Sequence, residues 1–186
     1  MMKIKFKFNI LVIGMATLCS CNKYFDKVNN VQIKKEGFFT FYKNVNIFDY
    51  YSNVNFKADN EVWYPKSFEV NLPKGIKYWE SSNSENFNFF YQGGQVILIH
   101  IDLQKSSTEN TVYTPTDLEI KEFIYQTLVN HNNKFSAEKI EINHSLKQIM
   151  IKKGSAKILL YNIANENYEA YFKALNTFRF YKKEYL

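Results

Sequence analysis

A pair of adjacent glycines between two apolar segments is the feature that most constrains how this chain folds. Gly93-Gly94 separates segment 86–92 from segment 95–103, and paired glycines favour the positive φ angles of a two-residue type I′ turn. The sequence therefore predicts a β-hairpin. Its second arm contains Val96-Ile97-Leu98-Ile99, which is apolar on both faces, so we expect this arm to be a central strand.

A helix is predicted directly after Pro115. Thr116 and Glu119 have the spacing of a capping box, which satisfies backbone N–H groups at a helix start. Apolar residues then recur every three or four positions, as on one helical face. They are Ile120, Phe123, Ile124 and Leu128. A second helix is predicted from Glu166, with an apolar face that consists of Tyr168, Tyr171, Phe172 and Leu175.

Alternation of apolar and polar residues predicts the remaining strands. Phe68, Val70 and Leu72 alternate with polar residues until Pro73 ends the run. Further strands are expected at 139–143, 148–152 and 157–163, and a short closing strand at 177–180. The aromatic-rich segment 38–51 is expected to form an initial strand and one helical turn. The predicted fold class is α+β, a mostly antiparallel sheet with two helices packed on it.

The order of these elements resembles the PsbP-like group, which includes periplasmic lipoproteins of the DcrB type. The resemblance covers Trp63 to Tyr181 and rests on the strand before Pro73, the mid-chain helix, and the ending segments 158–161 and 171–178. It implies a PsbP-like arrangement and an accessory or assembly role, and it transfers no catalytic residues.

The N-terminal segment has the pattern of an export signal. Lys3, Lys5 and Lys7 precede a short apolar run that ends at Leu18. A run of roughly ten apolar residues is shorter than the ~20 that a membrane-spanning helix needs. We therefore expect residues 1–20 to be a cleaved signal peptide.

The end of this segment resembles the lipobox of bacterial lipoproteins, because Leu18-Cys19-Ser20-Cys21 places a leucine three residues before a cysteine. The resemblance implies that Cys21 carries acyl chains such as palmitate and becomes the membrane-anchored N-terminus. The alternative is an ordinary secretory signal that ends near two chance cysteines. Asn22 follows in place of aspartate, which favours the outer membrane.

Composition adds to the lipoprotein interpretation. All basic residues except Arg179 are lysine, and asparagine, phenylalanine and tyrosine are abundant, which is typical of an AT-rich genome. With the lipobox, this composition resembles that of Bacteroidota lipoproteins. Asp26 is the only acidic residue soon after Cys21, which favours the periplasmic side of the outer membrane. Residues 21–36 are expected to form the lipidated cysteine and a short tether, and 37–186 a single globular domain.

Several function classes are disfavoured by the sequence. Without the three leader lysines the formal charge falls from +6 to +3, and no clustered basic patch points to nucleic acid. Cys19 leaves with the leader, so the folded part has no disulfide and no thiolate metal site. The chain has no G-x-S-x-G, Walker or G-x-G-x-x-G motif. We therefore expect no enzyme activity, no catalytic residues, no metal and no cofactor.

Histidines and carboxylates provide only weak candidate sites. His100 and Asp102 fall on the same side of a predicted strand, but a metal or general-base site needs a third convergent group. His131 is expected to interact with a helix dipole, and His144 with solvent. The possible glycosidase carboxylates, Glu61, Glu69, Glu80 and Glu85, are expected to be ordinary surface charges.

Four aromatic residues are the most suggestive candidates for a binding site: Trp63, Tyr64, Tyr78 and Trp79. Such rings stack on sugars and anchor protein partners. The interpretation that we favour is that they fill the core or shield a sheet edge near Pro65. The binding hypothesis expects Trp79 to be exposed in a loop after Gly75.

Two functions follow from these observations. The leading one is a lipid-anchored envelope protein that binds another protein as an accessory, assembly or immunity-type factor. The alternative is an envelope binding module for a glycan or small solute that uses exposed aromatics. An exposed aromatic pocket would favour the second, and a flat apolar patch would favour the first.

Overall fold

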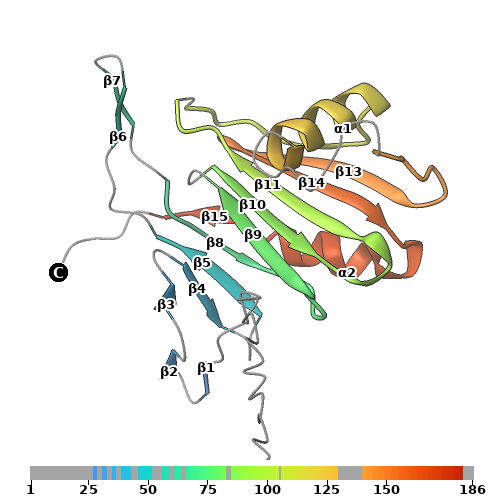
Figure 1. The fold of residues 1–186 in the computed structure, drawn as a ribbon, viewed down its shortest axis with the longest axis horizontal. Helices are drawn as coiled ribbons and strands as arrows, with labels where there is room; N and C mark the ends of the chain where they lie inside the picture. The colour runs from blue at the N-terminus through green and yellow to red at the C-terminus, as the bar shows by residue number, and fades with distance from the viewer. Residues whose placement is uncertain are drawn as a thin grey trace, which may run out of the picture.

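In its described residues, the computed structural model has an α+β fold with two main antiparallel sheets, two short two-stranded hairpins and two α-helices (Figure 1). The residues that it describes are 27–28, 31–32, 35–36, 39–42, 46–51, 56–58, 61–63, 66–82, 85–104, 106–129 and 140–181. The predicted α+β class is therefore confirmed. The predicted signal peptide, Cys21 and most of the predicted tether lie outside the described residues.

The larger sheet has six strands in the order β12-β13-β14-β11-β10-β9, all antiparallel to their neighbours. Their bounds are β9 Tyr78–Ser82, β10 Asn86–Phe90, β11 Val96–Ile101, β12 Asn110–Tyr113, β13 Lys147–Lys153 and β14 Ala156–Ile163. All six residues of β11 are buried, and this strand lies between β10 and β14, as its apolar sequence predicts.

The predicted hairpin is confirmed as β10–β11, but its turn is longer than a two-residue type I′ turn. Tyr91 N–H donates to the Gln95 carbonyl at 2.9 Å, which leaves the three residues Gln92–Gly94 in the turn. Both glycines have positive φ, 71° at Gly93 and 73° at Gly94, which is the conformation that glycine permits.

Helix α1, Asp117–Ile124, begins at the predicted capping box and continues into a π-helical segment, Tyr125–Val129. Glu119 N–H donates to Thr116 Oγ1 at 3.3 Å, and Thr116 N–H donates to the Glu119 carboxylate at 2.8 Å. The apolar face of α1 packs on one face of the larger sheet. The buried side chains at this contact form a hydrophobic cluster, which we call the α1 cluster: Phe90, Val96, Leu98, Ile120, Phe123, Ile124, Leu128, Met150 and Leu159.

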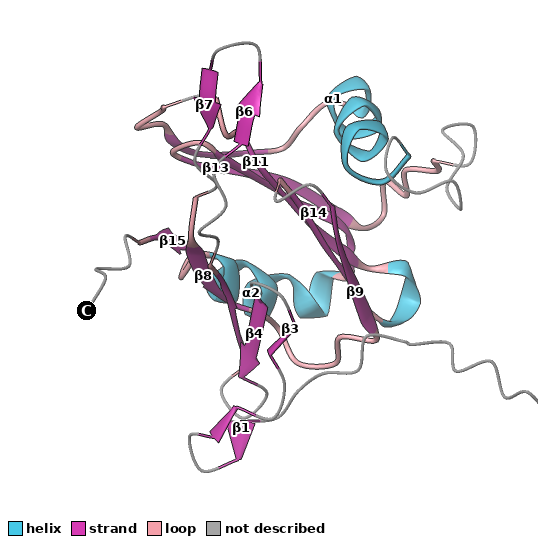
Figure 2. Ribbon diagram, turned by 60° about the vertical axis from the view of Figure 1, so that its left-hand side comes forward, coloured by secondary structure: helices cyan, strands magenta, loops and turns pink. Residues whose placement is uncertain are grey.

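The smaller sheet covers the opposite face of the larger one and has the order β15-β8-β5-β4-β3. Its strands are β3 Lys35–Glu36, β4 Phe39–Tyr42, β5 Ile47–Tyr50, β8 Phe68–Asn71 and β15 Arg179–Phe180. Helix α2, Asn165–Leu175, packs beside this sheet against the same core. Figure 2 shows α1 on one side of the larger sheet, with α2 and the smaller sheet on the other.

Aromatic side chains fill the space between the two sheets. Phe87 is fully buried, and its ring centroid lies 4.7 Å from that of Tyr50 and 4.9 Å from that of Phe68. Phe48 meets Phe89 edge-on at 4.9 Å. Such edge-to-face and tilted contacts match the quadrupoles of neighbouring rings. The domain is therefore held by an aromatic core rather than by an aliphatic one alone.

Strand β15 closes the smaller sheet by pairing with β8. Arg179 makes an ion pair with Glu69 on β8 at 2.6 Å, and the Tyr181 hydroxyl donates to the Asp49 carboxylate on β5. Burial and the neighbouring Asp49 carboxylate raise the pKa of Tyr181, so this phenol stays a hydrogen-bond donor. The C-terminal segment is thus fixed to strands that precede it by more than a hundred residues.

One predicted strand is not formed, and one predicted helical turn falls in a segment that is only partly described. Residues 140–143 form no strand: Ile140 and Ile142 pack on the α1 cluster as irregular chain, because β13 already has β12 and β14 as neighbours. The described residues of segment 38–51 form strands β4 and β5, and the helical turn expected there is not among them. Two short hairpins were not predicted: β1 Lys27–Val28 with β2 Val31–Gln32, and β6 Phe56–Ala58 with β7 Glu61–Trp63.

Candidate functional site

The structure separates the four aromatic candidates. Tyr64 lies outside the described residues, as does the side chain of Trp63 at the end of β7. Trp79 is only 7% exposed and packs edge-on against Phe39 and Phe48, so the core interpretation is confirmed for it and the exposure that the binding hypothesis expects is wrong. The reason is strand register, because Trp79 pairs with Phe89 and faces the smaller sheet.

Tyr78 has the opposite orientation and is 38% exposed. It pairs with Phe90 across β9 and β10, and the two rings stack at 4.3 Å with an interplanar angle of 11°. Phe90 is buried under the α1 side of the sheet, so it supports one face of the Tyr78 ring. Of the two members of the predicted group whose side chains are described, Tyr78 is therefore the one that lies at the surface.

The two described histidines, His100 and His144, lie in different parts of the larger sheet's surroundings and do not come together. His100 is buried, with Nδ1 2.9 Å from Asn86 Oδ1 and Nε2 3.2 Å from the Gln126 side-chain nitrogen. Asp102 lies beyond the end of β11 and accepts from Gln104 N–H, so it does not join His100. In the part of the chain that the structure describes, no three His, Cys, Asp or Glu side chains are grouped to hold a metal. His131 lies outside that part.

The predicted carboxylates also stay apart. Glu69 is engaged by Arg179 on the outer face of the smaller sheet. Glu80 lies on the edge strand β9, and Glu85 lies before β10, where its carbonyl accepts from Ile101 N–H. The side chain of Glu61 falls outside the described residues. Glu69, Glu80 and Glu85 lie on or next to different strands, and none of them lines the two cavities described below. These three carboxylates therefore do not form the pair that a glycosidase needs.

A cavity of about 540 Å³ opens beside Tyr78 on the α1 side of the larger sheet. We call it the Tyr78 cavity. Tyr78 and Phe90 form one wall, Ile124 and Leu128 another, and segment 140–143 with the end of β14 a third. Its volume lies within the range of about 300–1,000 Å³ that is common for small-molecule sites.

A β-bulge in β14 places two polar side chains in this cavity. Lys147 pairs with Ile163 but Ile149 pairs with Leu160, so β14 has one more residue than β13 between these pairs. Leu160 and Ile163 therefore both face the core, and Tyr161 and Asn162 both line the Tyr78 cavity. Bulges of this kind often redirect side chains next to functional sites.

The bulge requires an uncommon backbone conformation. Asn162 has φ 52°, in the left-handed region that asparagine enters more readily than most residues. Buried Gln148, on β13, stabilises it: the Gln148 amide donates to Asn162 Oδ1 at 2.7 Å and accepts from Asn162 N–H at 2.8 Å. The same side chain donates to the Asn143 carbonyl at 3.3 Å. Gln148 thus ties segment 140–143 to the bulge.

Two asparagine side chains have defined orientations at the cavity wall. Asn162 Oδ1 also accepts from Asn143 N–H at 3.3 Å, which fixes its nitrogen on the other side. Asn143 Oδ1 accepts from Ser145 N–H at 3.0 Å and from the Ser145 hydroxyl at 2.7 Å. Tyr161 donates to the Glu141 carbonyl at 2.5 Å, and burial raises its pKa. The cavity therefore combines an aromatic surface with oriented amide and phenol groups.

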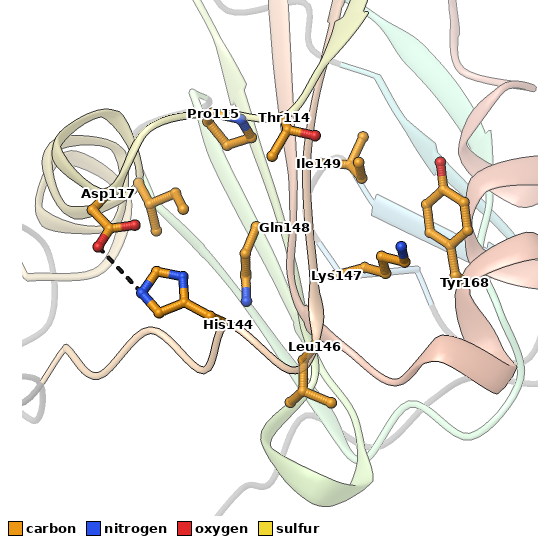
Figure 3. A pocket seen from close by; sticks show the side chains of 10 residues that line it. Thr114, Pro115, Asp117, His144, Leu146, Lys147, Gln148, Ile149 and Tyr168 are labelled. Carbon is orange, nitrogen blue, oxygen red and sulfur yellow. Dashed lines mark ion pairs between the residues drawn. The ribbon is translucent and has the colours of Figure 1, made fainter.

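A smaller cavity of about 300 Å³ is lined by Gln148 and by residues around the start of α1 (Figure 3). His144 and Asp117 line it and form an exposed ion pair, with Nε2 3.4 Å from Oδ2. Lys147 also lines it, and its Nζ lies 6.0 Å from the centre of the Tyr168 ring. This cavity is smaller than the Tyr78 cavity, and Asp117 and Lys147 in its wall each have a neighbouring side chain as a partner.

Lys66 and Ser155 form a pair that the sequence does not suggest. Lys66 Nζ lies 2.6 Å from Ser155 Oγ and 3.3 Å from the Asp102 carbonyl, and burial lowers the pKa of this lysine. A serine beside such a lysine is a possible nucleophile. Ser155 is only 7% exposed at the β13–β14 turn and lines neither cavity. The pair is better explained as a link between this turn and the segment that leads into β8.

Comparison of the chain with protein-family models, curated proteins and solved structures found no match. Among the described residues, the structure has no helix of the length and apolarity needed to cross a membrane. The geometry of the Tyr78 cavity is therefore the basis on which we infer a function.

Sequence reasoning found Tyr78 but missed Asn143, Tyr161 and Asn162. A change of phase marks the bulge, because the core residues Ile158, Leu160 and Ile163 are spaced by two and then by three. Leu159 is also apolar, which hides this change in a segment expected to form a regular strand.

Proposed function

We propose that this protein is a binding module for a glycan or small solute, which occupies the Tyr78 cavity. The observation that carries the proposal is the β-bulge at Tyr161 and Asn162, which places two polar side chains in the cavity that the stacked Tyr78 ring also lines. The buried Gln148 amide keeps Asn162 at positive φ, which is an energetically unfavourable backbone conformation. Such conformations are concentrated at functional sites.

The proposal includes a place of action. The lipobox-like sequence around Cys21 supports a lipid-anchored protein of the outer membrane that faces the periplasm. More than one acyl chain makes such an anchor effectively permanent. The binding module then meets its ligand in the cell envelope, a short tether away from the membrane surface.

The distribution of exposed apolar side chains supports a ligand site over a protein-docking surface. The large exposed examples among the described residues are Tyr78, Val112, Leu118 and Tyr125. Tyr78 and Val112 lie on strands at opposite edges of the larger sheet, and the other two are separated by two helical turns. A protein-binding accessory role would instead be supported by one contiguous apolar patch.

The PsbP-like arrangement belongs to the same proposal. The strand β8, the mid-chain helix α1, and α2 followed by β15 stand in the order that the resemblance implies. A crystal structure that superposed β8–β15 on members of that group with a shared strand order would support it, and a different strand order would refute it.

Saturation-transfer NMR with the purified full-length protein tests the binding function. The probes are maltotriose, cellotriose, triacetylchitotriose, trigalacturonate, tryptophan and decanoate, which cover neutral, acidic, aromatic and apolar solutes. We expect at least one probe to receive saturation from the protein and to lose it in Tyr78→Ala. Tyr125→Ala is the matched control, because it removes an exposed tyrosine outside the cavity. Absence of any Tyr78-dependent signal would refute the proposed function.

A further inference from the structure

The Tyr78 ring is suited to a ligand with a flat face of C–H groups. Its inner face is covered by Phe90 at 4.3 Å, so the ring is held in one orientation before any ligand arrives. The π face of an aromatic ring carries partial negative charge, and the C–H groups of a sugar ring carry partial positive charge. A ring that is already held in place loses little conformational entropy when it binds.

The asparagine pair adds hydrogen-bond donors of fixed direction. The oxygens of Asn143 and Asn162 are occupied by Ser145 and by Gln148, so the Nδ2 groups are directed away from those partners. Asn162 also forms a side-chain hydrogen bond with Tyr161, which takes up part of its donor capacity. Amide hydrogens of this kind suit hydroxyl oxygens, which accept and donate equally well. An apolar ligand would bury these amides without replacing their hydration.

The charges at the cavity do not favour an ionic ligand. Lys77 and Glu141 line it with opposite charges, and both are exposed. Carboxylates and phosphates are bound best by arginine or by several cations together. The only arginine of the chain, Arg179, is paired with Glu69 on the smaller sheet. A ligand with a strong net charge would therefore be poorly compensated here.

We propose that the ligand of the Tyr78 cavity is a neutral oligosaccharide, with one ring stacked on Tyr78 and the hydroxyls of another ring bonded to the side chains of Asn143 and Asn162. More than one ring is needed because two strands, β10 and β11, separate Tyr78 from the bulge in β14. This inference rests on the proposed function and specifies the class of ligand. The amide groups that would make the polar contacts are already oriented, that of Asn162 by the β-bulge and that of Asn143 by the turn at Ser145.

The test compares the affinities of the neutral trisaccharides maltotriose, cellotriose and triacetylchitotriose with those of trigalacturonate and decanoate, by NMR titration of the full-length protein. At least one neutral trisaccharide should bind more tightly than both charged probes. Tyr78→Ala should weaken that binding about two- to tenfold, and Tyr78→Phe should change it less than about twofold.

A second variant tests the amide contact. Asn162→Asp keeps the Oδ1 acceptor for Gln148 and tolerates positive φ, but it lacks the Nδ2 donor. We expect about two- to tenfold weaker binding of the neutral sugar, the value of one hydrogen bond. Asn110→Asp is the matched control, because it makes the same change on an exposed strand outside the cavity. Circular dichroism of each variant confirms that the fold is retained, and if Tyr78→Ala unfolds, Asn162→Asp carries the test.

The outcomes separate the two proposals. Tyr78-dependent binding confined to trigalacturonate or decanoate would overturn the neutral-sugar inference and leave the proposed function standing. Neutral-sugar binding that is unchanged in both Tyr78→Ala and Asn162→Asp would overturn both, since the ligand would then bind elsewhere. Absence of Tyr78-dependent binding for every probe would also overturn both.

Discussion

Replacement of Gln148 by methionine should destabilise the domain through the β-bulge. Methionine has nearly the length of glutamine, so Gln148→Met removes hydrogen bonds without opening a large cavity. Two bonds to Asn162 are short, at 2.7 and 2.8 Å, and the third, to the Asn143 carbonyl, is weaker at 3.3 Å. At about 0.5–1.5 kcal/mol for each short bond, the free energy of unfolding should fall by about 2 kcal/mol.

Urea unfolding followed by circular dichroism measures this change. With a slope of about 2 kcal/mol per M, the unfolding midpoint should fall by about 1 M. Gln92→Met is the control, because Gln92 is exposed in the β10–β11 turn and its replacement should stay within about 0.5 kcal/mol. Hydrogen exchange adds a local measurement, since the Asn162 amide that donates to Gln148 should exchange faster while the central amides of β14 do not. A loss below about 0.5 kcal/mol would show that the bulge is not held by this amide.

Four further predictions concern the helix start, the core and the anchor. Thr116→Ala should cost about 1 kcal/mol in urea unfolding by removing the α1 cap. The hydrogen bonds from Thr116 lower the pKa of Glu119, so the ionised carboxylate stabilises the helix above about pH 4.5. This stabilisation is lost as the pH falls through the folded pKa. Urea unfolding at a series of pH values should show the loss in the parent protein but not in Glu119→Gln. Phe87→Ala should cost about 3–5 kcal/mol, and a loss below about 1 kcal/mol would contradict the described aromatic core. Cys21→Ala should abolish labelling by palmitate and release the protein from membranes, whereas a processed, membrane-bound variant would refute the lipid anchor.

Local sequence patterns predicted the elements whose conformation is determined by neighbouring residues. The Gly93-Gly94 pair identified the β10–β11 hairpin, and the spacing of Thr116 and Glu119 identified the start of α1. In these cases the residues that determine the conformation lie within a few positions of each other. The predicted turn of two residues was too short, because Tyr91 N–H donates to the Gln95 carbonyl and three residues lie between them.

The parts that could not be predicted depend on contacts between distant segments. Trp79 is buried because its strand pairs with β10 and brings it opposite Phe39 of the smaller sheet, a contact that no local pattern encodes. The division into two sheets has the same origin. The Tyr78 cavity itself was not predicted. The sequence singled out Tyr78, but Asn162 enters the cavity through a bulge that Gln148 stabilises from a neighbouring strand.

The pairing of β15 with β8 has a consequence for the time course of folding. Arg179 and Glu69 are 110 positions apart, so the smaller sheet is completed only when nearly the whole chain is available. Contacts of such long sequence separation slow folding, and sheet proteins rich in them fold in milliseconds to seconds. During synthesis β8 keeps an open edge until the last segment emerges, which prolongs the interval in which the chain is exposed to misassociation. Shortening the chain before Arg179 would therefore impair folding yield more than its small contribution to the core suggests.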